Sequence, residues 1–288
     1  MGVSRSISVS DLALCQKCPA LLAYKIFKGA KTAWHVGIKG SGYAYGSLFH
    51  KNIAKVFFEG ASNPESILYE KIAASLRYSS SLESMISKYI LIPLLDSNSE
   101  QLMTEQVDAM NRAITVWIRA MSEFFMGIPS LLKNPEKNMH KIFIQPEQKL
   151  KAYYNFSNGN TLVVKGCYDA LMFNPDKAEA RLFEFKGHMK SDITVPLSQS
   201  LIYSWLIWKK SGIFPSVEII YLDEIEKKPD IFEPSFVEKM IKTQLPELFH
   251  SAFSVLLSKR VPEILRDKKL CSVCPFKNSC IKDWGGKQ

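Results

Sequence analysis

The most informative stretch of this sequence for the fold is Gly166-Cys-Tyr-Asp169, which is followed by a turn and by Glu184-Phe-Lys186. Both parts lie in apolar segments typical of neighbouring β-strands. Strand alternation places Glu184 and Lys186 on one face and Phe185 on the other. An aspartate at the start of the neighbouring strand would bring two carboxylates and an ammonium group to one point. Two carboxylates can hold a hard divalent cation, and a lysine beside them can orient water and stabilise phosphate charge.

The Glu-x-Lys triplet is weak by itself, because it occurs three times, ending at Lys149, Lys186 and Lys228. The last copy lies in a polar run that indicates a solvated turn, and the first lies in a mixed strand that contains a proline. Only the middle copy follows apolar residues and has an aspartate on the preceding strand. A surface strand with an ordinary charge pair remains the alternative interpretation of that copy.

Composition favours a folded protein with a polyanionic partner. The chain has 288 residues, of which 47% are hydrophobic and 11% aromatic, enough for one large domain or one domain with an insertion. No apolar stretch approaches the length of a membrane span, and the N-terminus lacks the apolar core of a secretory signal. We therefore expect a cytoplasmic protein without a membrane partner. The formal net charge of +9 favours partners such as nucleic acid.

The first half of the chain has mainly helical patterns. Capping groups at Ser8 and Asp11 predict a helix from residue 9, and Cys18-Pro19 predicts a break that begins a second helix. Glycine-rich residues 29–45 predict a loop, and an apolar period near 3.6 predicts a helix over 46–58. Residues 64–132 are helical in pattern, with the longest segment at 99–126, before the helix breakers Pro129 and Pro135.

The second half predicts an α/β fold. Three antiparallel strands are expected at 141–156, 161–173 and 180–187, joined by turns at 157–160 and 174–177. A helix over 195–211, a strand over 217–222 and a helix over 235–260 complete a mixed sheet flanked by helices. Four parts are expected: N-terminal helices (1–59), a helical insertion (60–135), the core (136–260) and a cysteine-rich segment (261–288).

Three further polar residues are candidates for a site. His50 lies on the first turn of an expected helix, where a histidine could bind a divalent metal or meet a phosphate. Gln199 and Tyr203 share one face of a predicted helix and could donate hydrogen bonds to phosphate oxygens. Taken alone, these residues are better explained as boundary residues of amphipathic helices.

The cysteines predict a second site. Cys271, Cys274 and Cys280 lie within one short segment, and their spacing favours a metal site over disulfides. Three clustered thiolates and a distant fourth suit a 4Fe-4S cluster, with zinc as the alternative. Either Cys15 or Cys18 would supply the fourth ligand. Cys167 is expected to be a small core residue.

Six motifs in order carry a family resemblance. They are Cys18-Pro19 after a Ser-x-Ser-x-Leu start, Gly46-x3-His50, Gly166-x2-Asp169, Glu184-x-Lys186, Gln199-x3-Tyr203 and Cys271-x2-Cys274-Pro-x5-Cys280. With them the chain resembles the PD-(D/E)XK nuclease superfamily, and within it the RecB-like exonucleases that carry an iron–sulfur cluster. These include the CRISPR-associated RecB-like exonucleases, the AddB nuclease domain and the exonuclease V group. Two departures are that Tyr168 replaces the proline before Asp169 and that residues 60–135 are longer than a compact CRISPR-type member needs.

The resemblance implies a restriction-endonuclease-like fold and a role for each matching residue. Asp169 and Glu184 would bind Mg²⁺ or Mn²⁺, with His50 and the Phe185 backbone carbonyl as further ligands, and Lys186 would activate or orient the attacking water. Gln199 and Tyr203 would shape the rim of the active site and contact DNA. Glu147 would have a supporting role.

The resemblance also selects Cys18, which precedes a proline, as the first cluster ligand beside Cys271, Cys274 and Cys280. The implied function is a metal-dependent DNA exonuclease acting on single-stranded ends, with a structural cluster, in CRISPR adaptation beside an integrase. Two alternatives are a repair or recombination nuclease acting with a helicase and a non-catalytic DNA-binding scaffold subunit. A scaffold would not need the complete set of Asp169, Glu184, Lys186 and His50, which argues against that alternative.

Overall fold

The computed structural model describes most of the chain, and the longest gaps are 28–59, 93–103 and 259–270. The described residues are 2–27, 60, 63, 65–77, 84–85, 88, 92, 104–144, 148–187, 193–222, 224, 226–258, 271–272, 274 and 276–284. The expected loop at 29–45, the expected helix at 46–58 with His50, and Glu147 lie outside them. Among the described helices, none combines the length and the apolar character that a membrane crossing requires.

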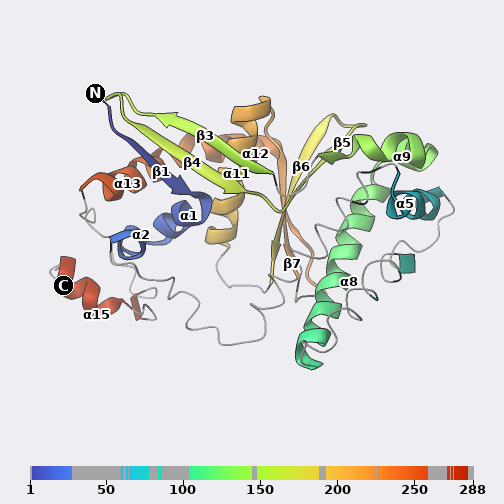
Figure 1. Ribbon diagram of the computed structural model, residues 1–288, viewed down its shortest axis with the longest axis horizontal. Helices are drawn as coiled ribbons and strands as arrows, with labels where there is room; N and C mark the ends of the chain where they lie inside the picture. The colour runs from blue at the N-terminus through green and yellow to red at the C-terminus, as the bar shows by residue number, and fades with distance from the viewer. Residues whose placement is uncertain are drawn as a thin grey trace.

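The strands form two mixed sheets (Figure 1). In the three-stranded sheet, β4 (Thr161–Cys167) lies between β1 (Ser4–Ser8), which is parallel to it, and β3 (Lys149–Asn155), which is antiparallel. The five-stranded sheet has the order β2 (Phe143–Ile144), β5 (Ala170–Asn174), β6 (Glu179–Lys186), β7 (Ser216–Tyr221) and β8 (Asp230–Phe232). Only β6 and β7 are parallel in this sheet. The predicted mixed α/β class is confirmed.

The prediction of one strand over 161–173 was wrong. The structure divides it into β4 and β5, which belong to different sheets, and Tyr168 and Asp169 lie between them. Both halves are apolar, so the pattern gave no sign of the change of sheet. The short strands β1 and β8 were not predicted, because their hydrogen bonds come from distant partners, β4 and β7.

The N-terminal helices form as their local signals predict. Helix α1 (Val9–Lys17) begins after Ser8, whose side chain accepts a hydrogen bond of 3.1 Å from the Asp11 N–H. Helix α2 (Pro19–Phe27) begins at the predicted proline. The helical region contains α5 (Ile67–Arg77), α8 (Thr104–Met126), α9 (Pro129–Lys133), α10 (Pro135–Asn138) and the 3₁₀ helix η4 (Met139–Lys141). The two predicted breakers, Pro129 and Pro135, also begin helices, because the fixed φ of proline suits a first turn.

The C-terminal helices differ from the prediction in one place. Helix α11 (Thr194–Ser211) forms as predicted and ends at Gly212, whose φ of +76° is left-handed. The predicted helix over 235–260 is two helices, α12 (Pro234–Thr243) and α13 (Leu245–Ser258). Because Pro246 has no N–H to continue an existing helix, it lies in the first turn of a new one. Helix α15 (Lys277–Trp284) lies near the C-terminus.

Two hydrophobic cores cover opposite faces of the five-stranded sheet. One joins α5, α8 and α9 to Phe183 and Phe185 of β6, whereas the other joins α1, α11, α12 and α13 to Leu182. In Figure 1, α5, α8 and α9 lie to the right of this sheet, and α1, α2 and α13 lie to the left. The alternation of β6 therefore directs Glu184 and Lys186, like Leu182, toward the α11 side.

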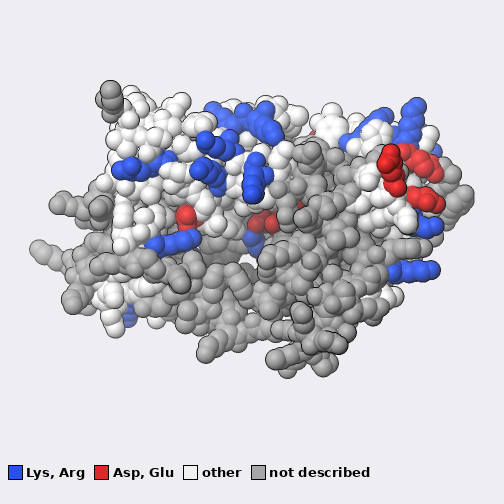
Figure 2. Space-filling view, viewed as in Figure 1, with Lys and Arg blue, Asp and Glu red and all other residues white. Residues whose placement is uncertain are grey.

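Surface charge is unevenly distributed on the face that Figure 2 presents. Lys and Arg side chains gather over β3 and β4, whereas Asp and Glu side chains gather mainly near α5 and α9. The exposed acidic residues of the helical side include Glu70 on α5 and Glu136 on α10.

Candidate functional site

Two carboxylates lie at the adjoining ends of β5 and β6. The ladder pairs Ala170 with Phe183, so the next pair outward is Asp169 with Glu184. Residues opposite each other in an antiparallel pair project from the same face of the sheet. The Asp169 Oδ2 atom accepts a hydrogen bond of 2.9 Å from the Phe185 N–H. Glu184 is only 4% exposed. The structure thus brings the two predicted carboxylates together in a largely buried position.

Lys186 joins this pair from the same face of β6. Its Nζ donates one hydrogen bond to Glu184 Oε1 and another, of 2.8 Å, to Gln199 Oε1 on α11. Burial lowers the pKa of Lys186, but Glu184 and Asp169 raise it by more, so its pKa lies above the ordinary value. The lysine is therefore a positively charged group that two acceptors hold in a fixed position.

Tyr203 lies one turn after Gln199 on α11 and is half-buried. Burial raises its pKa most, and the negative charges of Glu184 and Asp169 raise it further. Its phenol therefore remains a neutral hydrogen-bonding group close to the carboxylates.

Gly166 makes the position of Tyr203 possible. A Cβ atom at residue 166 would lie 2.7 Å from Tyr203 Cε1 and would overlap the Val9 side chain. The sequence identified Gly166 only as part of a motif and did not predict this packing. An isolated glycine inside a strand was the available signal, because it often marks a close approach of another group.

The described side chains fit a divalent cation by charge and by donor type. Among the described side chains of the site, Asp169 and Glu184 are two carboxylates and Lys186 is one ammonium group. Carboxylate oxygens and a backbone carbonyl, such as that of Phe185, are the ligands that Mg²⁺ and Mn²⁺ prefer. The expected third side-chain ligand, His50, lies outside the described residues. Within the described residues, no three His, Cys, Asp or Glu side chains surround a common point.

The residues of the second predicted site come from segments near the two ends of the chain. Cys18 lies between α1 and α2, and its pKa is raised by burial and also by the neighbouring thiols of Cys271 and Cys274. The ring of Tyr24 on α2 stacks on that of Phe276, with 4.7 Å between centroids and 10° between planes. Cys280 follows on α15. The structure therefore places Cys18 close to two of its three expected partners, although the four thiols do not surround one point.

The remaining cysteines have different surroundings. Cys15 is 1% exposed, its Sγ lies 3.9 Å from Ser251 Oγ, and burial raises its pKa to about 11. The expectation that Cys167 is a core residue was wrong, because it is exposed. The alternation of β4 places Lys165 and Cys167 on the outer face of the three-stranded sheet. All six cysteines are described, and none forms a disulfide.

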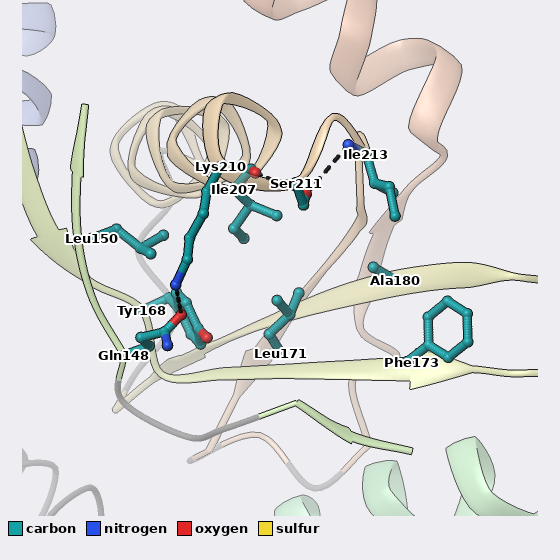
Figure 3. A pocket seen from close by; sticks show the side chains of 10 residues that line it. All are labelled: Gln148, Leu150, Tyr168, Leu171, Phe173, Ala180, Ile207, Lys210, Ser211 and Ile213. Atoms are coloured by element: carbon teal, nitrogen blue, oxygen red, sulfur yellow. Dashed lines mark hydrogen bonds between the residues drawn. The ribbon is translucent and has the colours of Figure 1, made fainter. Parts of the chain in front are cut away.

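A cavity of about 490 Å³ lies apart from the carboxylates, between the end of α11 and strands β3, β5 and β6 (Figure 3). Its lining is mainly apolar, and at its edge Lys210 Nζ donates a hydrogen bond of 2.8 Å to Gln148 Oε1. Asp169, Glu184 and Lys186 do not line it. The cavity is therefore separate from the candidate active site.

Comparisons with known proteins identify the family of this chain. The model of the PD-(D/E)XK nuclease superfamily matches residues 6–281. Among solved structures, the crystal structure of a "Putative exonuclease" from Eubacterium rectale matches with a TM-score of 0.43 and 11% identity, over 95% of this chain and 87% of that one. No curated protein matches. Because the family model covers nearly the whole chain, the protein belongs to the PD-(D/E)XK nuclease superfamily.

Proposed function

We propose that this nuclease is a metal-dependent DNA exonuclease that acts on single-stranded ends. The observation that carries the proposal is the meeting of Asp169, Glu184 and Lys186 at the ends of β5 and β6. Asp169, Glu184 and the Phe185 carbonyl would hold Mg²⁺ or Mn²⁺, with His50 as a further ligand. When bound, such an ion supplies Lewis-acid stabilisation of phosphate charge and lowers the pKa of bound water.

The chain's own residues would position the substrate and the water. Glu184 and Gln199 hold the Lys186 ammonium group from two sides, so its remaining proton can point toward a water molecule or a phosphate oxygen. A fixed ammonium group stabilises the negative charge that develops on a phosphate during attack. Tyr203, whose phenol stays neutral, can donate a hydrogen bond at the same site without adding charge.

The test uses anaerobically purified protein, Mn²⁺ and end-labelled single-stranded DNA. Glu184→Gln and Lys186→Met should each lower kcat by roughly 100-fold or more, because each removes a charge that acts on the reacting phosphate. Glu218→Gln is the matched control. Glu218 is also 4% exposed, but it pairs with Arg181 on the α8 side of the sheet. Wild-type rates in both site variants would overturn the assignment.

Substrate form separates an exonuclease from an endonuclease. A circular single strand has no ends, so the proposal predicts that it resists cleavage while the linear strand of the same sequence is degraded. Cleavage of both forms at similar rates would contradict the exonuclease part of the proposal.

Processing of spacer precursors beside a CRISPR integrase is the biological setting that we propose. The long helical region at 60–135 favours, as a second candidate, a repair nuclease acting with a helicase.

We also propose that Cys18, Cys271, Cys274 and Cys280 hold a structural 4Fe-4S cluster that ties the chain ends together. The proximity of Cys18 to Cys271 and Cys274, and the stacking of Tyr24 on Phe276, support this assignment. Iron and zinc analysis of anaerobically purified protein distinguishes the two metals. Cys18→Ser should lose the bound iron, whereas the control Cys15→Ser should keep it, because Cys15 faces Ser251 instead. Equal iron contents in the two variants would refute the ligand assignment.

A further inference from the structure

The outer face of the three-stranded sheet has a regular arrangement of polar side chains. The register places Lys149 opposite Cys167, Lys151 opposite Lys165, and Tyr153 opposite Val163, so all of these residues share one face. The alternate residues of β3 and β4, which include Leu150, Ala152, Leu162 and Val164, are buried in the core on the other face. The lysines of both strands therefore project away from the core.

This face is strongly biased toward positive charge. On this face strands β1, β3 and β4 carry three basic residues, Lys149, Lys151 and Lys165, and no acidic residue. Their fourth basic residue, Arg5, pairs with Leu162 and therefore projects from the other face. Within the described part of the chain, Lys149, Lys151 and Lys165 form no ion pair. Figure 2 shows basic side chains gathered over β3 and β4. Lys151 and Lys165 lie directly opposite each other, and such a like-charged pair opposes strand pairing unless an anion lies over it.

An exposed aromatic ring lies among these charges. Tyr153 is 54% exposed, and Lys151 Nζ lies 5.0 Å from the centroid of its ring. On the same face of the described strands, Val163 lies opposite Tyr153, and the small polar residues Ser6 and Thr161 flank Val163. Unpaired bases stack on exposed aromatic rings, while lysines follow the phosphate backbone. Duplex DNA keeps its bases stacked on each other, so the ring favours a single strand.

The face also leads to the candidate active site. Lys165 precedes Asp169 by only four residues, so the two Cα atoms are at most roughly 13 Å apart. Between them, Cys167 is the last residue of β4 and is exposed on the same outer face. Because Lys151 and Lys165 project away from the α11 core and Glu184 projects toward it, a strand that crosses these lysines would pass around the end of β4, at Cys167, to reach Asp169 and Glu184.

We propose that Lys149, Lys151, Tyr153 and Lys165, the lysine face, bind the single strand of DNA that enters the active site. The proposal rests on the proposed nuclease function, since it assigns the path of that substrate. The three lysines contact phosphates, and Tyr153 stacks on a base. Recognition is independent of sequence, because neither kind of contact reads base edges.

Binding is measured by fluorescence anisotropy in the Glu184→Gln background, with a labelled single strand and the matching duplex over a range of salt concentrations. Changing Lys149, Lys151 and Lys165 together to glutamine should weaken single-strand binding on the order of 10-fold and reduce the salt slope by about 0.7 per lysine. The matched control changes three exposed lysines elsewhere, Lys133, Lys137 and Lys239, and should keep both quantities near those of the parent.

Tyr153→Ala tests the stacking contact. It should weaken single-strand binding by roughly 5-fold or more and leave the salt slope and duplex binding unchanged. Equal losses for single strand and duplex would refute the preference for a single strand. Circular dichroism and urea unfolding confirm that each variant is folded before binding is compared.

The outcomes separate this inference from the proposed function. An unchanged affinity and salt slope in the triple-lysine variant, with an active wild-type nuclease, would refute the lysine face alone. Lysine-dependent DNA binding by a wild type that cleaves no DNA with Mn²⁺ would support the face and refute the nuclease. In the active enzyme, the triple variant should raise KM for single-stranded DNA with little change in kcat, because its lysines bind the strand away from the reacting phosphate.

Discussion

Replacing Gly166 by alanine should damage the active site through Tyr203. The new Cβ would lie 2.7 Å from Tyr203 Cε1, and it would also overlap the Val9 side chain. A carbon–carbon contact needs about 3.5 Å, so the ring would have to retreat by roughly 0.8 Å. Val9 cannot easily give way, because it is β-branched and only 1% exposed.

The expected size of the effect follows from these contacts. Inserting one methyl group into a packed site without room costs about 1–3 kcal/mol of the free energy of unfolding. The displaced ring is the one that lies beside the charges of Glu184 and Asp169. Because a misplacement of about 1 Å can cost on the order of 100-fold in rate, we expect kcat to fall by roughly 10- to 100-fold.

Urea unfolding and cleavage of end-labelled single-stranded DNA measure the two effects. In a Val9→Ala background, Gly166→Ala should cost less stability, because one of the two overlaps is gone. Gly212→Ala is the matched control. Its φ of +76° should cost about 1–2 kcal/mol, but the space around it is open and its cleavage rate should not change. A Gly166→Ala variant with wild-type stability and rate would refute the packing argument.

Three further predictions concern stability. Burial raises the pKa of Glu218 by more than Arg181 lowers it, so this carboxyl contributes stability at low pH that is lost as the pH rises through its folded pKa. Wild type should therefore lose stability relative to Glu218→Gln from about pH 4.5 upward, and parallel pH profiles in urea unfolding would contradict this. Lys165→Thr removes one of the two opposed lysines and should raise the free energy of unfolding by about 0.2–1 kcal/mol at low salt and by less at high salt. A lower free energy of unfolding in this variant would count against the register of β3 and β4. Tyr24→Leu removes the stacking on Phe276 and should lower the free energy of unfolding by about 0.5–1.5 kcal/mol. It should also speed proteolysis near residue 276. Unchanged proteolysis would argue against docking of the chain ends.

Elements with strong local signals agree with the structure. The Ser8–Asp11 cap starts α1, Pro19 starts α2, and the helix predicted over 195–211 is α11. The turn at 174–177 forms because the Asn174 side chain accepts hydrogen bonds from the N–H groups of Asp176 and Lys177. Each of these interactions joins residues at most a few positions apart, so the sequence contains all the partners.

Longer-range features were predicted less well. The pattern made residues 235–260 one helix and Cys167 a core residue, and it missed β1 and β8. In each case the outcome depends on what packs against the segment. Strand β1 takes its hydrogen bonds from β4, about 150 residues away, and Cys167 is exposed because it projects from the outer face of β4, away from the core.

The candidate site also combines features that were predicted from local sequence and features that depend on long-range contacts. The sequence by itself determined that Glu184 and Lys186 share a face of β6, because side chains alternate with a period of two whatever the strand packs against. Only the tertiary structure decided that the apolar run at 161–173 changes sheets at Tyr168 and Asp169, which sets Asp169 opposite Glu184. It also decided that Lys151 faces Lys165 and that Tyr203 fits against Gly166. Alternation is a property of one strand, whereas register and close packing depend on residues that meet only when the chain folds.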